Sequence, residues 1–269
     1  MARAIIAGLL RQGRAAASLR VGELRAEARS QLEREYGIAV HADNAQILSG
    51  AALVVLAVKP QDAATALRAA SAHWPGPNAA LLSIVAGVRI EALARLCPAG
   101  TPIVRAMPNR PALLSAGVTG LYAPPSIPAP LRALAETLAA ATGHGVWVRN
   151  EDELDIVTAV SGSGPAYFLL LAEQLASAAQ ACGLSHETAR LLATETLYGS
   201  GMLAHSRARD EAGLKEERAA VTSPGGTTEA ALRVLQAAGL EQLVARAVQA
   251  ATTRSRELAA AFAASAAAD

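Results

Sequence analysis

The pattern of apolar and polar positions changes character near Asn150. Before that point, short apolar segments alternate with amphipathic segments of about 10 to 15 residues, which is typical of βαβ units in a doubly wound sheet. Beyond it no strand pattern occurs, and long Ala- and Leu-rich segments predict helices alone. The pattern therefore predicts an α/β domain over residues 1–150 and an all-helical domain over residues 151–269.

The individual elements follow from periodicity and from cap residues. The run from Ala51 to Val58 is apolar throughout and stops at Lys59-Pro60, which suits a strand buried on both faces of a parallel sheet. Gly37 in a left-handed C-cap and Asp43 as an N-cap mark the ends of neighbouring helices. The predicted strands cover 16–24, 38–40, 51–58, 80–85 and 102–107; the predicted helices cover 25–36, 44–48, 61–72, 89–96, 165–182, 186–208, 229–237 and 240–264.

The segment from Met1 to Gly22 contains four arginines and no acid. One interpretation is a targeting segment, with a basic start followed by a short apolar stretch. The other is an amphipathic helix with Ile5, Ile6 and Leu9 on one face and Gly13 as its stop. The composition of the segment leaves both interpretations open.

Composition narrows the class of protein. An apolar content of 52% with 17% charged residues excludes a disordered chain, and 24 basic against 23 acidic residues exclude nucleic-acid binding by bulk charge. Cys97 and Cys182 are the only cysteines, which is consistent with a reducing, cytoplasmic compartment. No apolar run approaches the ~20 residues of a membrane span, and the five histidines show no metal-binding spacing. The apolar faces of the helical half are extensive for a lone bundle, so we expect it to pair with a second copy.

Two turns follow predicted strands at the sheet edge where α/β proteins bind ligands. Ala57-Val-Lys-Pro-Gln61 places Lys59 beside a rigid turn, where it faces either an anionic cofactor or solvent. In Val104-Arg-Ala-Met-Pro-Asn-Arg-Pro111, two prolines stop the strand, and Asn109 offers donor and acceptor groups either to a ligand or to the turn itself.

A third loop, Val221-Thr-Ser-Pro-Gly-Gly-Thr-Thr228, precedes a predicted helix. Pro-Gly-Gly predicts a tight turn, and Thr227 or Thr228 can cap the helix. Free N–H groups at a helix start attract a carboxylate or phosphate, so we predict an anion site here; the alternative is a plain link between helices. Ser163 lacks the preceding strand of a nucleophile elbow, and Pro165 opening a helix is the simpler interpretation.

In this order, several segments resemble pyrroline-5-carboxylate reductases. They are Met1-Ala-Arg-Ala-Ile-Ile-Ala-Gly-Leu, Ala42-Asp-Asn44, Leu56-Ala-Val-Lys-Pro-Gln61, Val104-Arg-Ala-Met-Pro-Asn109, Ala159-Val-Ser-Gly-Ser-Gly-Pro-Ala-Tyr-Phe168 and Val221-Thr-Ser-Pro-Gly-Gly-Thr-Thr228. The resemblance implies a Rossmann-like NAD(P)-binding domain followed by a helical dimerisation and substrate-binding domain, in a homodimer that can assemble further. It implies an oxidoreductase of proline biosynthesis, which reduces 1-pyrroline-5-carboxylate to L-proline by hydride transfer from NAD(P)H.

The resemblance also assigns residues, and it makes Thr228 the catalytic hydroxyl at the ring nitrogen of the substrate. The implied substrate-binding residues are Val221, Thr222, Ser223, Gly226, Thr227 and Thr228; the implied cofactor-binding residues are Asn44, Ala57, Val58, Lys59, Pro60, Met107 and Asn109.

Three departures from the family pattern affect the expectations. Arg110 stands where the family often has Thr, and we expect it to point outward. Glu23 at the end of a predicted strand favours NAD, whereas Arg25 can bind a 2′-phosphate; because the reaction is biosynthetic, we expect NADP, with NAD as the alternative.

The third departure is the largest: the chain carries neither the first Rossmann strand nor its Gly-x-Gly-x-x loop. We expect the native product to be longer by about a dozen residues, since a central strand of a Rossmann sheet contributes on the order of 10 kcal/mol of burial. On this view the first segment is the first Rossmann helix and not a targeting signal. The alternatives are a truncated, non-catalytic relative that binds as a dimer, and a dehydrogenase of another imine or keto acid.

Overall fold

The computed structural model describes residues 1–208 and 210–268, which form two compact units. The first unit contains Met1–Ser163 and the returning segment Ala250–Asp269, and the second contains Gly164–Gln249. The sequence predicts a cofactor-binding domain over 1–150 and a substrate-binding domain over 151–269, and this assignment of roles stays a prediction. The compact division follows Ser163, and the end of the last helix belongs to the first unit.

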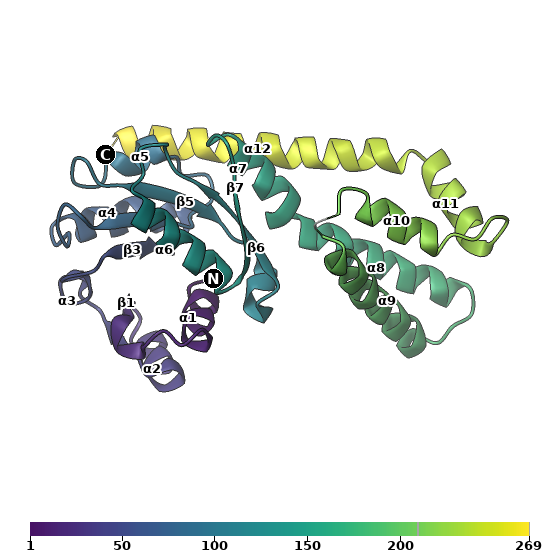
Figure 1. The fold of residues 1–269 in the computed structure, drawn as a ribbon, viewed down its shortest axis with the longest axis horizontal. Helices are drawn as coiled ribbons and strands as arrows, with labels where there is room; N and C mark the ends of the chain where they lie inside the picture. The colour runs from purple at the N-terminus through teal and green to yellow at the C-terminus, as the bar shows by residue number, and fades with distance from the viewer. Residues whose placement is uncertain (209, 269) are drawn as a thin grey trace. The chain divides into compact units, whose positions relative to one another are not determined.

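The first unit is built from helices and strands that alternate along the chain, as the pattern predicts (Figure 1). Its strands are β1 (Arg20–Gly22), β2 (Ala39–His41), β3 (Leu53–Leu56), β4 (Ala80–Ser83), β5 (Ile103–Met107), β6 (Gly117–Tyr122) and β7 (Gly143–Trp147). Its α-helices are α1 (Ala2–Arg11), α2 (Ala26–Tyr36), α3 (Asn44–Leu48), α4 (Ala63–Ser71), α5 (Ile90–Ala94), α6 (Ala129–Ala140) and α7 (Glu153–Val157). Short helical turns are η1 (Ala16–Ser18), η2 (Pro60–Asp62), η3 (Arg110–Leu114) and the π-helical η4 (Thr158–Gly162).

Strands β3 to β7 form one sheet in chain order. β3, β4 and β5 are parallel, β6 runs antiparallel to β5, and β7 is parallel to β6. Leu82, Val104 and Leu121 lie in the core on this sheet, together with Leu138 of α6. The sequence pattern predicted β3, β4 and β5 but not β6, α6 or β7.

β1 and β2 form a separate parallel pair. Helix α1 packs against both sheets, because Ile5 and Leu9 join the core of the larger sheet while Ile6 joins Val40 in the core of the smaller one. The edges of β1 and β3 that face away from their partners pair with no strand among residues 1–208 and 210–268. Burial on both faces of β3 was therefore too strong a prediction: only Leu56 is buried, and the rest of the strand is partly exposed. The expectation of an upstream strand stays a prediction.

Local predictions near the start of the chain are largely confirmed. α1 is an amphipathic helix, and Gly13 follows it with a φ of 86°. α2 ends at Gly37 in the left-handed conformation, and the Asp43 side chain accepts a hydrogen bond of 2.9 Å from the N–H of Ala45. The strand predicted over 16–24 is shorter, since its first part forms η1 and only Arg20–Gly22 pairs.

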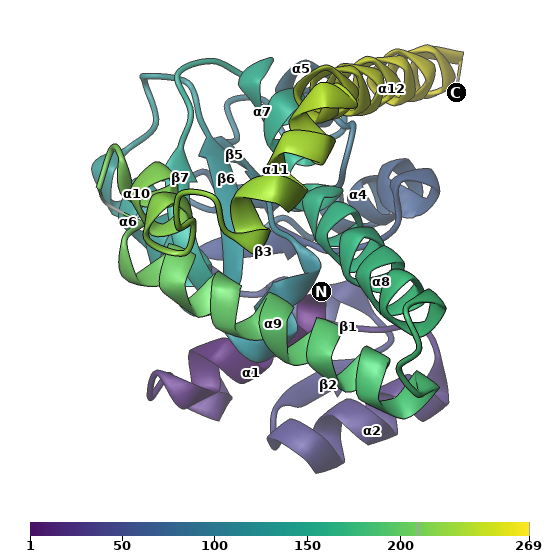
Figure 2. The ribbon, with the colours of Figure 1, turned by 90° about the vertical axis from the view of Figure 1, so that its right-hand side faces the viewer.

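The second unit is helical, as predicted. It holds α8 (Gly164–Ala181), α9 (His186–Ser206), α10 (Gly213–Ala220), α11 (Thr227–Ala237) and the first part of α12 (Leu240–Ala268). α8 and α9 form a helical hairpin, with Ser185 capping α9 by accepting from the N–H of Thr188 (Figure 2). Most large apolar side chains of α8 and α9 are exposed in the single chain.

Helical residues run from Glu153 to Ala181 through α7, η4 and α8, with a bend at Ser163. As expected, Pro165 stands in the first turn of a helix, because α8 begins at Gly164, after the π-helical η4 and the bend. By length and composition alone, this stretch is the one helix in the described part of the chain that could cross a membrane. The expectation of no such segment considered only uninterrupted apolar runs; core helices of water-exposed proteins meet the same criterion.

Candidate functional site

The carboxyl ends of the parallel strands β3 and β5 lie at the same edge of the sheet, separated by β4. β3 leads into the turn of Ala57, Val58 and Lys59, and Pro60 opens η2 in the first-turn position that suits a residue without an N–H. Lys59 is exposed. β5 ends at Met107, which is partly buried. Edges of this kind bind nucleotides in open α/β sheets, so the predicted residues of both turns share a suitable position.

A second group of predicted cofactor residues lies at the end of β1. A Cβ on Gly22 would lie 2.9 Å from the Oδ1 atom of Asn44, so the absence of a side chain there permits α3 to approach the strand. The Glu23 carboxylate accepts from the backbone N–H of Arg25 at 2.9 Å and from its Nε at 3.3 Å. Arg29 donates to the carbonyl oxygens of Glu23 and Leu24.

The two arginines keep the carboxyl group of Glu23 ionised. Burial alone would raise the pKa of Glu23, but the hydrogen bonds from Arg25, with the charges of Arg25 and Arg29, outweigh it and lower that pKa. Glu23 is therefore an ionised group already satisfied by Arg25, whose own side chain is 80% exposed. An exposed guanidinium beside a second arginine can receive a phosphate group at the end of β1.

Asn109 lies at the start of η3 and is 8% exposed. Its Nδ2 donates to the carbonyl oxygen of Ser161 at 3.0 Å, and its Oδ1 accepts from the N–H of Val118 at 2.9 Å. Both polar ends of the side chain therefore bond within the protein, and its assignment to the cofactor stays a prediction. Arg110 is exposed, as expected.

The predicted substrate residues all lie in one loop of the second unit, between α10 and α11. The turn is tight as predicted, with Gly225 at a φ of +71° and a Cβ on Gly226 only 3.0 Å from the oxygen of Ser223. The Thr222 hydroxyl donates to the carbonyl of Arg218 at 2.6 Å. Residues Val221 and Ser223 are exposed, whereas Thr228 is half-buried.

Capping of α11 differs from the prediction. The helix begins at Thr227, and the residue in the N-cap position is Gly226. Since glycine has no side chain, no side-chain hydrogen bond caps the helix, and neither threonine takes this position. Instead, Glu229 in the first turn accepts from the N–H of Gly225 at 2.7 Å. Thr227 and Thr228 are the first two residues of α11, at the end of the helix where backbone N–H groups favour an anion.

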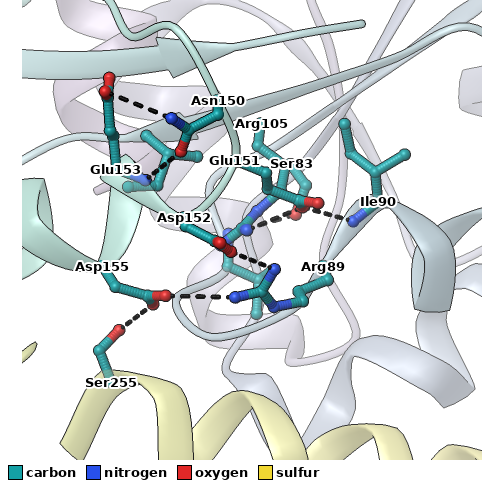
Figure 3. A network of polar contacts seen from close by, with 12 residues as sticks. Ser83, Arg89, Ile90, Arg105, Asn150, Glu151, Asp152, Glu153, Asp155 and Ser255 are labelled. Carbon is teal, nitrogen blue, oxygen red and sulfur yellow. Dashed lines mark hydrogen bonds and ion pairs between the residues drawn. The ribbon is translucent and has the colours of Figure 1, made fainter. Parts of the chain in front are cut away.

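A polar network in the first unit was missed by sequence reasoning (Figure 3). Glu151 accepts from the N–H of Ile90 at 2.7 Å and from the buried Arg105 at 2.9 Å. Asp155 accepts from Ser255 at 2.6 Å and faces Arg89 at 3.4 Å. In the sequence, residues 151–155 show only an acidic run that suits a helix start, and no periodic signal links it to partners so distant in the chain.

Two family models of known proteins match parts of the chain. Residues 151–258 match the family model for pyrroline-5-carboxylate reductase dimerisation, and residues 1–87 match a model described as NADP oxidoreductase, coenzyme F420-dependent. The chain is 43% identical over 259 residues to the pyrroline-5-carboxylate reductase of Pseudomonas aeruginosa, covering 96% of this chain and 93% of that one.

Solved structures show the same similarity. The pyrroline-5-carboxylate reductase of Coxiella burnetii superposes with a TM-score of 0.90 at 35% identity, over 96% of this chain and 94% of that one. The enzyme of Plasmodium falciparum, solved with NADP bound, shares the fold with a TM-score of 0.78 at 24% identity, over 96% and 94% of the two chains.

Proposed function

The chain belongs to the pyrroline-5-carboxylate reductase family, and from that premise we propose that it reduces 1-pyrroline-5-carboxylate to L-proline with a hydride from NADPH. The observation that carries the proposal is a similarity that extends over both units, at 43% identity across 96% of the chain. As a member of this family, the chain is an oxidoreductase that uses a nicotinamide cofactor. The substrate, the residues and the choice of NADPH are what we propose.

The residues at the sheet edge suit a dinucleotide. The turn of Ala57 to Pro60, with Asn44 beside the end of β1, would hold the cofactor, and Met107 would lie at its nicotinamide end with Asn109 behind it. The nicotinamide, when bound, supplies the hydride. These residues orient the ring and shield one face from water, which aligns the reacting atoms.

The loop before α11 would hold the substrate. Its carboxylate would bind at the N-terminus of α11, where the N–H groups and the hydroxyls of Ser223 and Thr227 face it, with Val221, Thr222 and Gly226 around it. The hydroxyl of Thr228 would donate a hydrogen bond to the lone pair of the neutral imine nitrogen. As the hydride reaches the carbon and the C=N bond becomes C–N, this hydroxyl would pass its proton to the nitrogen and regain one from water. The hydrogen bond makes the C=N carbon more electrophilic, so one neutral hydroxyl suffices for this step.

NADPH is proposed over NADH because of the charges at the end of β1. A ribose 2′-hydroxyl needs a free carboxylate, but Glu23 is engaged by Arg25. A 2′-phosphate needs a cation, and Arg25 is 80% exposed with Arg29 close by. The local balance of charge therefore favours the phosphate.

The partner that we propose is a second copy of this chain, in the cytoplasm, with neither a nucleic acid nor a membrane as partner. Phe168, Leu169, Leu170 and Leu171 of α8 are 52 to 62% exposed, although they point to all sides of one helix. A helix that is apolar all round is normally buried. Because residues 151–258 match a dimerisation model, a second helical unit is the expected cover.

A steady-state assay of the full chain tests the function. With 1-pyrroline-5-carboxylate and NADPH, we expect oxidation of NADPH and formation of L-proline in equal amounts. Parallel reactions with a six-membered cyclic imine carboxylate and with 2-keto acids provide the controls. Preference for one of those substrates contradicts the assigned substrate, and an intact dimer that neither binds NADPH nor turns over supports a non-catalytic binding protein.

A further inference from the structure

The π-helical turn before α8 leaves one carbonyl group in need of a partner. In a regular helix the N–H of residue 165 would donate to the carbonyl oxygen of Ser161, but Pro165 has no N–H and its ring crowds that oxygen. The chain widens locally instead, and the N–H of Ser163 donates to the oxygen of Thr158 at 2.9 Å. Turns of this type often accompany functional sites.

Asn109 supplies the missing donor from another element. Its Nδ2 donates to the oxygen of Ser161 at 3.0 Å, and its Oδ1 accepts from Val118 of β6 at 2.9 Å. The carboxamide is almost fully buried, so both of its ends are used within the protein. Asn109 thus holds the segment after β5 against the π-helical turn.

The same two segments also touch through Met107 and Gly162. A Cβ on Gly162 would lie 3.0 Å from the Cε atom of Met107, so the Met107 side chain lies directly on the turn. Met107 is the last residue of β5, and Asn109 follows it two positions later. A change in one is therefore expected to move the other.

We propose that Asn109 is a positioning residue for the reduction: its bond to Ser161 fixes the π-helical turn, which in turn fixes Met107 beside the nicotinamide. The inference rests on the proposed function, because only there does Met107 adjoin a reacting ring. Asn109 does not touch the cofactor in this scheme. It acts through the turn, and small errors in alignment are costly to hydride transfer.

Three variants separate positioning from simple structural support: Asn109→Ala, Pro165→Ala and the double variant. Pro165→Ala restores an N–H that can donate to Ser161, whose oxygen accepts two hydrogen bonds, so we expect kcat within about threefold of the unmodified chain. Asn109→Ala is expected to lower kcat by about tenfold or more and to lower Tm, with the Kd for NADPH changed by less than about threefold. In the double variant the helix satisfies Ser161 itself, so we expect Tm to recover while kcat stays low.

A second readout does not depend on turnover. The chain has 3 methionines, so methyl-labelled Met107 gives an NMR signal that is readily assigned by substitution. We expect this signal to differ from that of the unmodified chain in both Asn109 variants, with and without NADPH, and to be nearly unchanged in Pro165→Ala.

The inference is overturned if the double variant regains full kcat together with Tm, or if Asn109→Ala leaves the Met107 signal in place. Absence of turnover in the unmodified chain would contradict the proposed function instead, and the NMR comparison would still test the link from Asn109 to Met107.

Discussion

The hydroxyl of Ser255 donates a hydrogen bond of 2.6 Å to the carboxylate of Asp155, although the two residues are 100 positions apart in the chain. Both side chains are buried. The other carboxylate oxygen of Asp155 lies 3.4 Å from Arg89 and 3.9 Å from Arg256, so one acid joins α7, the start of α5 and the middle of α12. This is how the returning segment of the chain is attached to the first unit.

Asp155→Ala is therefore expected to be strongly destabilising. It leaves the Ser255 hydroxyl without its acceptor in a buried position and removes the buried partner of Arg89. Removal of one member of a buried charged network costs about 3 kcal/mol or more of unfolding free energy. Urea denaturation of the full chain measures the loss.

Asp152→Ala is the matched control, because Asp152 pairs with the same arginine at the shorter distance of 2.7 Å. Its side chain is 66% exposed against 5% for Asp155, so water already screens the pair. We expect a loss of less than about 1 kcal/mol. Equal losses for the two variants would mean that burial does not govern this network.

The βαβ half of the fold could be predicted because its apolar runs and caps are local signals. Asp43, Gly37 and Gly13 all occupy the cap positions expected of them. β6 and β7 escaped prediction because Gly117, Gly120, Gly143 and Gly145 interrupt their apolar pattern. A Cβ on Gly143 would lie 1.9 Å from the oxygen of Gly117, so glycine stands where an apolar pattern would otherwise be.

The hydrogen-bond partners of the candidate site residues could not be predicted from the sequence. Sequence reasoning singled out Asn109 as a donor and acceptor, yet its bond to Ser161 spans 52 positions and depends on the missing N–H of Pro165. Likewise, nothing periodic relates Asp155 to Arg89 or Ser255. Such pairs are set by the tertiary fold, which a single sequence does not display.

Replacement of Thr228 by alanine tests the proposed catalytic hydroxyl. Without a donor to the ring nitrogen, kcat is expected to fall by about 10²-fold, while the Kd for NADPH stays within about threefold because the cofactor residues lie elsewhere. Thr228→Ser keeps the hydroxyl and should retain most of the turnover. A Thr228→Ala variant with unchanged kcat would exclude this residue from the mechanism.

Arg25→Ala tests the cofactor preference. Loss of the exposed guanidinium removes a cation for the 2′-phosphate and releases the Glu23 carboxylate, which repels that phosphate. We expect KM for NADPH to rise about tenfold, and KM for NADH to stay the same or fall, because the freed Glu23 carboxylate can accept from a ribose 2′-hydroxyl. Arg34→Ala, which removes an exposed arginine from the other end of α2, should leave both values unchanged. Parallel changes for the two cofactors would argue against a 2′-phosphate contact.

The two cysteines should differ in reactivity. Burial raises the pKa of the Cys97 thiol to about 11, whereas Cys182 is exposed. At pH 8 the thiolate fraction of Cys97 is then roughly 0.1%, so iodoacetamide should modify Cys182 first. Intact-protein mass spectrometry of Cys182→Ser should show little labelling at pH 8; rapid labelling would contradict the burial of Cys97.

The same thiol makes the stability of the fold depend on pH. Because the folded state holds the Cys97 proton more tightly than the unfolded state, stability from this group is present below about pH 9 and is lost as the pH rises toward 11.

The exposed face of α8 predicts the oligomeric state. Leu170 is 55% exposed in the single chain. If a second helical unit covers this side chain, Leu170→Glu places a charge in an apolar interface. Sedimentation velocity should then show a dimer for the unmodified chain and a shift toward monomer for the variant. Leu24→Glu is the control, since Leu24 is 83% exposed and lies outside the helical unit, so the dimer should persist. A Leu170→Glu variant that remains fully dimeric would remove α8 from the interface, and binding of the unmodified chain to neutral lipid vesicles would point to a membrane as the cover of this helix.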